Sequence, residues 1–224
     1  MAAPILKAEK LSRTLDGEIK VTLVKEADFQ AKAGEFVSIT GPSGSGKSSL
    51  LYLLGLLDRP TSGRIYIEDE DVLALNDERL AKIRLAKMGF VFQFHFLLPE
   101  FSALENVMIP MKRLGKLNEV QARERGEELL CDLDLKDQIH KLPRQMSGGQ
   151  CQRVAIARAL ANDPILILAD EPTGNLDSVS SQTVQEILRK LAHERGRTVV
   201  AVTHDMDFAA SADRQVRIVD GRIV

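Results

Sequence analysis

The chain has 224 residues and a formal net charge of −2, and 44% of its residues are hydrophobic and 28% charged. These values are typical of a globular domain, and the near-neutral charge gives no sign of a nucleic-acid-binding surface. The two cysteines, Cys131 and Cys151, match no metal-ligand spacing and no disulfide framework, which fits a reducing compartment.

No stretch approaches the roughly 20 apolar residues that a membrane span requires. The start of the chain, Met1 to Pro4, has no charged region followed by an apolar one, as a signal peptide would. We therefore expect a chain that is neither exported nor embedded, and that works at a membrane only through a partner.

Short apolar runs alternate with helical patterns, which predicts an α/β domain with a largely parallel sheet. Near the beginning, Ile5–Leu11 and Ile19–Phe29 predict a more alternating, antiparallel β region. Residues Ser180–Glu194 predict an amphipathic helix that Gly196 ends. The predicted buried strands are Phe36–Thr40, Gly89–Phe92, Ile165–Ala169 and Thr198–Thr203.

Helical patterns dominate between Phe94 and about Leu160, for example at Glu119–Leu133. We interpret residues 94–160 as a helical insertion in a core formed by residues 1–93 and 161–224. The whole chain, 1–224, is then one domain.

The stretch from Gly41 to Ser48 matches the phosphate-loop spacing G-x-x-x-x-G-K-[ST]. It follows the strand Phe36–Thr40 and precedes an apolar helix at Ser49–Leu57, which is the context that such a loop requires. Its glycines let backbone N–H groups surround phosphate oxygens, and the helix start favours an anion. The alternative is a glycine-rich turn that binds nothing. The residues expected to contact the nucleotide here are Gly41, Pro42, Ser43, Gly44, Ser45, Gly46, Lys47, Ser48 and Ser49.

Two carboxylates, Asp170 and Glu171, follow the buried strand Ile165–Ala169. The carboxyl end of a buried parallel strand lies at the ligand crevice of an open sheet. We expect Asp170 to hold Mg²⁺ together with Ser48, and Glu171 to act as general base on the attacking water. A solvated acidic turn is the alternative interpretation.

Further along the chain, Met146-Ser147-Gly148-Gly149-Gln150 resembles the signature sequence of ATP-binding-cassette (ABC) proteins. Gln93, at the end of a strand, is similar to the Q-loop glutamine of that family. Asn175-Leu176-Asp177 resembles its D-loop, and His204 its switch histidine. These elements occur in the order typical of the family and cover essentially the whole chain.

The resemblance implies a P-loop NTPase fold of the ABC cassette type, with a RecA-like core, an antiparallel β subdomain and a helical subdomain. It implies an ATPase with ATP and Mg²⁺ as cofactors and with Lys47, Glu171 and His204 as catalytic residues. Gln93 would contact ATP, and Ser48, Gln93 and Asp170 would serve the Mg²⁺ ion. The protein would form a nucleotide-dependent, head-to-tail homodimer, in which Asp177 lies in the D-loop. The residues that would contact the ATP of the partner subunit are Ser147, Gly148, Gly149 and Gln150.

Within the family, Phe90–Gln93, Leu104–Val107 and Ala169–Asp177 look like the macrolide-export and lipoprotein-release group, including its YbbA-like members. That group implies integral membrane permease subunits as partners. It also implies a cytoplasmic protein held peripherally on the inner membrane through the permease, with no direct insertion and no nucleic acid. The apolar cluster of Phe94, Phe96, Leu97, Leu98 and Pro99 is either a docking edge for the permease or a locally packed loop.

The chain departs from the family pattern at three positions, Met146, Cys151 and Leu15. Met146 is a mild apolar replacement for leucine. The thiol of Cys151, near a helix start, is either more acidic than usual or simply a small residue in a helix. Leu15 stands where the family usually places an aromatic residue that stacks on adenine, so we expect weak discrimination between bases.

Three other functions compete with transport. Nucleic-acid-directed ABC ATPases carry a long coiled coil between the Q-loop and the signature, for which the segment from Phe94 to Met146 is too short. A scaffolding role at the division septum stays open, because the choice of permease lies outside these motifs. A small-molecule kinase would need no signature sequence.

Overall fold

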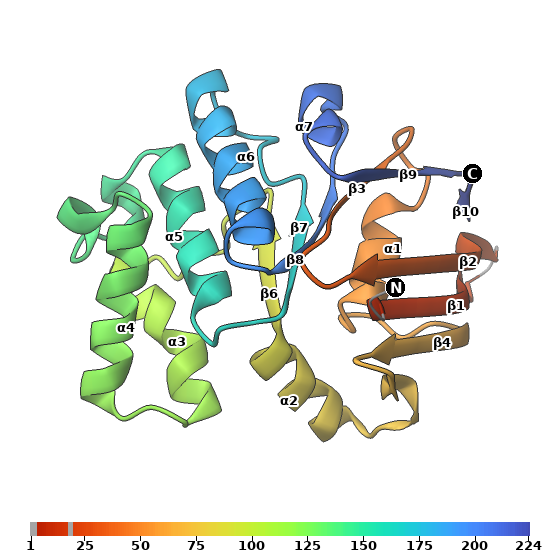
Figure 1. The fold of residues 1–224 in the computed structure, drawn as a ribbon, viewed down its shortest axis with the longest axis horizontal. Coiled ribbons are helices and arrows are strands. Elements are labelled where there is room, and N and C mark those ends of the chain that lie inside the picture. Colours follow the sequence, from red (N-terminus) through yellow and green to blue (C-terminus); the bar gives the residue numbers. More distant parts are fainter. Residues whose placement is uncertain (1–3, 18–19) are drawn as a thin grey trace. The chain divides into compact units, whose positions relative to one another are not determined.

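The computed structural model describes residues 4–17 and 20–224. Met1–Ala3 and Ile19, at the start of the second predicted β segment, lie outside the described residues. The chain divides into two compact units. Unit 1 comprises Met1–Ala81 and Leu188–Val224, and unit 2 comprises Lys82–Ile187. Figure 1 shows the elements of both.

Unit 1 contains an antiparallel sheet with the strand order β2-β1-β4-β5. As predicted, the first two strands alternate between buried and exposed residues, and β1 pairs antiparallel with both β2 and β4. The alternation is interrupted at Lys10 and Glu26, whose φ angles of 45° mark bulges in the β1–β2 pairing. The strands are β1 (Pro4–Leu15), β2 (Val21–Lys32), β4 (Ser62–Ile67) and β5 (Glu70–Asp71).

Unit 1 also contains parallel strands, in which β3 (Phe36–Thr40) pairs with β8 (Thr198–Val202) and with β9 (Arg214–Val219). All residues of β3 and β8 are buried, which explains why apolar residues dominate both strands, with Ser38, Thr40 and Thr198 as buried polar exceptions. The remaining elements are β10 (Arg222–Ile223), the 3-10 turn Val72–Ala74, α1 (Lys47–Leu54) and α7 (Met206–Ala210).

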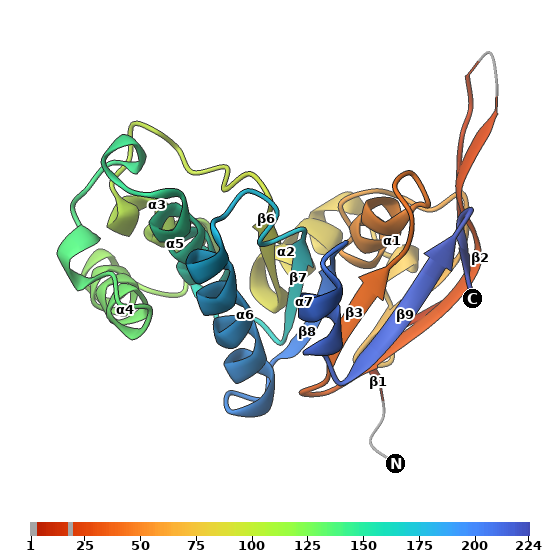
Figure 2. The same ribbon diagram turned by 90° about the horizontal axis from the view of Figure 1, so that it is seen from above.

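Unit 2 has a parallel pair formed by β6 (Met88–Phe92) and β7 (Leu166–Asp170). Figure 2 shows its helices α3, α4 and α5 gathered as a group. They are α3 (Ala103–Leu114), α4 (Glu119–Asp132) and α5 (Gly148–Leu160), with 3-10 turns at Lys136–Gln138 and Pro143–Gln145. The divisions between the units fall within α2 (Asp77–Lys87) and α6 (Ser178–His193).

Helix α5 lies directly on the backbone of β6. A Cβ atom added to Gly89 of β6 would lie 2.5 Å from the carbonyl oxygen of Ala159, so only glycine fits at this position. Val154 and Ile156 of α5 are fully buried. The helix that begins with the signature residues is therefore closely packed against the strand that precedes Gln93.

The loop before α3 is held by one buried side chain, that of Asn106, which has no exposed surface. Its Oδ1 accepts from the backbone N–H of Leu98 at 2.8 Å. Its Nδ2 lies within hydrogen-bond distance of the carbonyl oxygens of Leu98, Phe101 and Ser102, at 3.0 to 3.1 Å. One amide thus satisfies the backbone of a loop that has no regular structure of its own.

We predict that Asn106→Ala lowers the free energy of unfolding by about 3 kcal/mol, because it leaves several buried backbone groups unpaired. Denaturant titration measures the change. Asn118→Ala is the control, since Asn118 caps α4 at an exposed position and its loss costs about 1 kcal/mol. Equal effects of the two substitutions would contradict the role of Asn106.

Candidate nucleotide-binding site

The phosphate loop joins β3 to α1 in unit 1 and depends on glycine at two positions. Gly41 has a φ of 151° and Gly46, the residue before α1, a φ of 100°. A Cβ atom would lie 2.1 Å from the carbonyl oxygen of Ile218 at Gly41, and 2.2 Å from that of Leu23 at Gly46. The backbone of β9 and β2 thus presses against the loop, and any side chain at these positions would force the loop to open.

Hydrogen bonds fix the loop in a shape suited to an anion. The N–H of Gly221 donates to the carbonyl of Ser45 at 2.9 Å. The Lys47 ammonium donates to the carbonyl oxygens of Gly41 and Pro42, at 2.9 and 3.0 Å, and so lies over the loop. The buried hydroxyl of Ser45 has no hydrogen-bond partner in the described part of the chain. A cation over the loop and an unsatisfied donor within it both fit a bound phosphate.

His204 is the other predicted site residue of unit 1, and it follows β8. In the parallel register, Val202 of β8 lies beside Ile39 of β3, and the N–H of Thr203 donates to the carbonyl of Ile39 at 3.1 Å. Asp205 then caps α7. The structure therefore brings the phosphate loop and His204 to the same edge of the parallel strands of unit 1.

In unit 2, Gln93 and Glu171 follow the neighbouring strands β6 and β7, in which Phe92 pairs with Asp170. Asp170 is 9% exposed, and Glu171 is half-buried. The Gln93 amide Nε2 donates to Oδ1 of Asn175 at 3.0 Å. The structure therefore joins the predicted Q-loop to the segment that follows the carboxylate pair.

The signature residues begin α5, and Ser147 is its N-cap. The Ser147 hydroxyl accepts from the N–H of Gln150, and the Gln150 side chain accepts from the N–H of Ser147. Gly149 is buried, and a Cβ atom there would lie 2.4 Å from the hydroxyl oxygen of Ser180 in α6. The glycine thus allows the start of α5 to lie against the start of α6.

Asp177 is fixed in the same way at the start of α6. Its carboxylate accepts from the N–H and the hydroxyl of Ser180, at 3.0 and 2.7 Å. These hydrogen bonds stabilise the charged form and lower the pKa of Asp177 below its usual value. The D-loop carboxylate and the signature glycine therefore contact the same serine.

Cys151 is buried, and its thiol lies 3.5 Å from the carbonyl oxygen of Pro143. Burial raises the pKa of this thiol, because the thiolate would lose its hydration. The suggestion that the helix start makes Cys151 more acidic is therefore wrong, and Cys151 is a small buried residue.

Two polar residues of unit 2 beside Gln93, Gln152 and His95, were not among the predicted site residues. Gln152 is fully buried in α5, and its Oε1 lies 2.6 Å from Nδ1 of His95. Arg158 of the same helix also reaches this region, where its guanidinium donates to the carbonyl oxygens of His95 and Phe96. The only signal in the sequence is a polar side chain on a helix face that is otherwise apolar.

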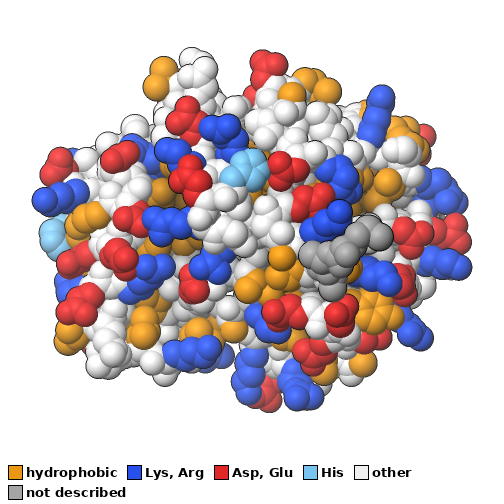
Figure 3. Space-filling view, in the orientation of Figure 1, with side chains coloured by type: hydrophobic (Ala, Val, Ile, Leu, Met, Phe, Trp, Pro, Cys, Tyr) orange, Lys and Arg blue, Asp and Glu red, His pale blue; other side chains and the backbone are white. Residues whose placement is uncertain are grey.

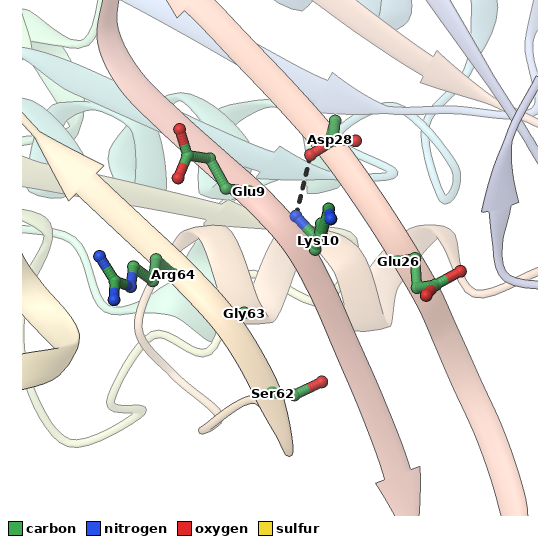
Figure 4. Close-up of a pocket in the computed structure, with 7 residues that line it drawn as sticks. All are labelled: Glu9, Lys10, Glu26, Asp28, Ser62, Gly63 and Arg64. Atoms are coloured by element: carbon green, nitrogen blue, oxygen red, sulfur yellow. Dashed lines mark hydrogen bonds between the residues drawn. The ribbon is translucent and has the colours of Figure 1, made fainter.

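A depression in unit 1 has none of the predicted ATP contacts in its lining (Figure 4). It is lined by Glu9, Lys10, Glu26, Asp28, Ser62, Gly63 and Arg64. The Lys10 N–H donates to Asp28 there, at 2.9 Å. Three of the lining side chains are carboxylates, which would repel a polyphosphate, so we do not assign nucleotide binding to this depression. Acidic and basic side chains are also intermingled on the face drawn in Figure 3, which offers no broad basic patch.

The chain matches the family model described as ABC transporter over residues 24–174. It is 49% identical to the lipoprotein-releasing system ATP-binding protein LolD of Aquifex aeolicus, over 99% of this chain and 97% of that protein. It is 48% identical to the macrolide export ATP-binding/permease protein MacB of Bartonella henselae, over 100% of this chain but only 34% of that longer protein.

Two solved structures of the ATP-binding cassette MJ0796 superpose with a TM-score of 0.90 at 44% identity. Each covers 97% of this chain and 96% of its own. Both are described as dimeric, and one is a post-hydrolysis state bound to ADP and phosphate.

In the part of the chain that the structure describes, no helix has the length and apolar character of a membrane-spanning segment. The fold of the whole chain agrees with that of the solved cassettes. The chain therefore belongs to the ABC transporter family, as an ATP-binding and ATP-hydrolysing cassette.

Proposed function

We propose that this chain is the motor subunit for a separate membrane permease of the lipoprotein-release or macrolide-export type. The permease would hold it at the cytoplasmic face of the inner membrane. The near-complete coverage of LolD, which is an ATP-binding protein of a lipoprotein-releasing system, supports this assignment over a fused protein such as MacB. The structural observation that carries the proposal is an exposed aromatic surface directly after Gln93.

We call this surface the aromatic edge; it consists of Phe94, Phe96, Leu98 and Phe101. Phe94 and Phe96 are 63% and 64% exposed, and their ring centroids lie 6.4 Å apart. The Asn106 amide fixes the loop that carries Leu98 and Phe101. Large apolar side chains gathered on a fixed loop are typical of a protein interaction site. An apolar segment of a permease is the proposed occupant.

The nucleotide chemistry is assigned to named side chains. Lys47 would neutralise charge on the β- and γ-phosphates, and the loop amides would bind their oxygens. Ser48, Gln93 and Asp170 offer the hydroxyl, amide and carboxylate oxygens that suit Mg²⁺, which uses few protein ligands and completes its shell with phosphate and water. Bound there, the ion would screen the charge that develops on the phosphates.

The half-buried carboxylate of Glu171 would accept the proton of the attacking water. His204 would hydrogen-bond the γ-phosphate. Release of the phosphate after hydrolysis would then remove contacts of both His204 and Gln93. The signature residues Ser147 to Gln150 present helix-start amides suited to a phosphate. The dimeric relatives support a head-to-tail homodimer, in which these amides bind the ATP of the partner subunit.

The first test of this function asks whether the aromatic edge binds the permease. The double substitution Phe94→Ser with Phe96→Ser should abolish co-purification of the permease with the tagged chain, while the basal ATPase rate of the isolated chain stays within about twofold. Val120→Ser is the control, since Val120 is an equally exposed aliphatic residue of unit 2, at 63%. The proposal fails if the double variant retains the permease, or if the partner is not an integral membrane protein.

Glu171→Gln should bind ATP with near-normal affinity but lower kcat by at least about 100-fold, because an amide cannot accept the proton of the water. ATP should then hold the variant as a dimer in size-exclusion chromatography, whereas the nucleotide-free chain elutes as a monomer. Lys47→Ala should lose both hydrolysis and the ATP-dependent dimer. Wild-type turnover by Glu171→Gln would remove Glu171 from the role of base.

We expect the adenine ring of ATP to lie against Leu15, at the end of β1. Leu15 pairs with Val21 across the β1–β2 hairpin, and the two side chains are 43% and 48% exposed. Leu23 lies two residues along β2, and its carbonyl backs Gly46 of the phosphate loop. The exposed aliphatic pair of Leu15 and Val21 supports an adenine-binding surface that has no aromatic ring.

Leu15→Tyr should tighten ATP binding several-fold, because stacking on a base is worth roughly 1–3 kcal/mol and an aliphatic contact gives less. In the wild type, GTP should compete almost as well as ATP. Equilibrium titration with both nucleotides measures this, with Leu57→Tyr, at a similarly exposed leucine beyond the end of α1, as control. A strong ATP preference in the wild type, unchanged in Leu15→Tyr, would show that another residue recognises adenine.

A further inference from the structure

Gln152 connects three segments of unit 2 that flank the proposed catalytic residues. Its Nε2 lies 3.1 Å from the carbonyl oxygen of Phe92, the residue before Gln93. The same nitrogen lies 2.6 Å from the carbonyl oxygen of Pro172, the residue after Glu171. Its Oε1 lies 2.6 Å from Nδ1 of His95. The side chain is fully buried on the signature helix α5.

The orientation of this amide follows from its partners. Carbonyl oxygens only accept hydrogen bonds, so the two that face the amide require its NH₂ group. Oε1 must then face His95, and it can only accept. The Nδ1 atom of His95 therefore carries a hydrogen, which fixes the neutral ring as the Nδ1–H tautomer. Both amide hydrogens and the amide oxygen are in use.

The contact with Pro172 acts on an unusual piece of backbone. Glu171 has a φ of 47°, in the left-handed region that non-glycine residues rarely adopt. The turn that follows is closed by the N–H of Gly174, which donates to the carbonyl of Glu171 at 3.1 Å. Gln152, on helix α5, donates to the next carbonyl along the chain, that of Pro172. The carbonyl of Glu171 and the carbonyl of the next residue are thus both held by hydrogen bonds.

We propose that Gln152 is a positioning residue for ATP hydrolysis, which sets Glu171 and Gln93 in place from the helix that presents the signature. Its polar atoms are all engaged by other residues, so it acts through the backbone of Pro172 and Phe92. His95 completes the arrangement by binding the amide oxygen, and Arg158 of the same helix holds the carbonyl oxygens of His95 and Phe96. The inference rests on the proposed role of Glu171 as the base.

The test compares Gln152→Leu and Gln152→Glu with the wild type, using the full chain. Both variants lack the donors to Phe92 and Pro172, so kcat for ATP hydrolysis should fall about 10- to 100-fold, as a small displacement of a reacting group does, while KM changes little. Gln152→Glu keeps an acceptor for His95. Nitrogen NMR of the His95 ring should therefore show Nδ1–H in the wild type and in Gln152→Glu, and its loss in Gln152→Leu.

Val154→Ala is the control for simple destabilisation, because Val154 is fully buried on the same helix and contributes only an apolar side chain. It should lower the melting temperature and leave kcat unchanged. The proposal is overturned if a folded Gln152 variant keeps the wild-type kcat, or if Val154→Ala loses kcat to the same extent.

An Nε2–H tautomer of His95 in the wild type also overturns the proposal, whether or not the variants fold. The role of Glu171 as general base is tested independently of Gln152. If Glu171→Gln hydrolyses ATP normally, Glu171 is not the general base. If only the Gln152 variants are normal, Glu171 keeps its role and Gln152 loses its own.

Discussion

The rest of the site depends on where buried parallel strands end. A strand that is covered on both faces can expose polar groups only at its ends, and the carboxyl ends of parallel strands share one edge. In unit 1 the phosphate loop follows β3, and His204 follows β8. In unit 2 Gln93 follows β6, and Glu171 follows β7. The pairing of strands thus decides which reactive side chains become neighbours.

A sharp turn directly after a strand requires positive φ angles, which cost conformational free energy. The chain adopts these angles in two ways. In the phosphate loop, glycines take up the positive φ angles, and the surrounding backbone is too close for any side chain. Glu171 has no such freedom, and a left-handed conformation costs a non-glycine residue about 1–2 kcal/mol. The turn to Gly174 and the hydrogen bond from Gln152 to Pro172 offset that cost. A carboxylate is retained at a position where its backbone is strained.

The parts that could be predicted from sequence are those written in local patterns. The buried strands Phe36–Thr40 and Thr198–Thr203 are mostly apolar runs, and the structure places them within one residue of their predicted bounds. The loop and signature residues were found because their spacing is specific, although their assigned roles stay predictions. The antiparallel pairing of the first strands was also confirmed, although bulges at Lys10 and Glu26 interrupt their alternation.

What could not be predicted depends on partners that are distant in sequence. Asn106 and Gln152 bind backbone carbonyl oxygens, and any residue type can supply a carbonyl, so no pattern announces these contacts. Two interpretations of Cys151 stayed open in the sequence for a related reason. A helix start is visible in the sequence, but the burial that raises the pKa of the thiol becomes known only from the fold.

The close approach of α5 to β6 at Gly89 has a mechanical consequence. Where α5 passes Gly89 of β6, the carbonyl oxygen of Ala159 lies too close for any side chain to separate the helix from the strand. Gln152 and Arg158 tie the same helix to the residues on either side of Gln93. If a neighbouring subunit displaced the signature, α5 would therefore move together with Gln93 and the aromatic edge as one rigid unit.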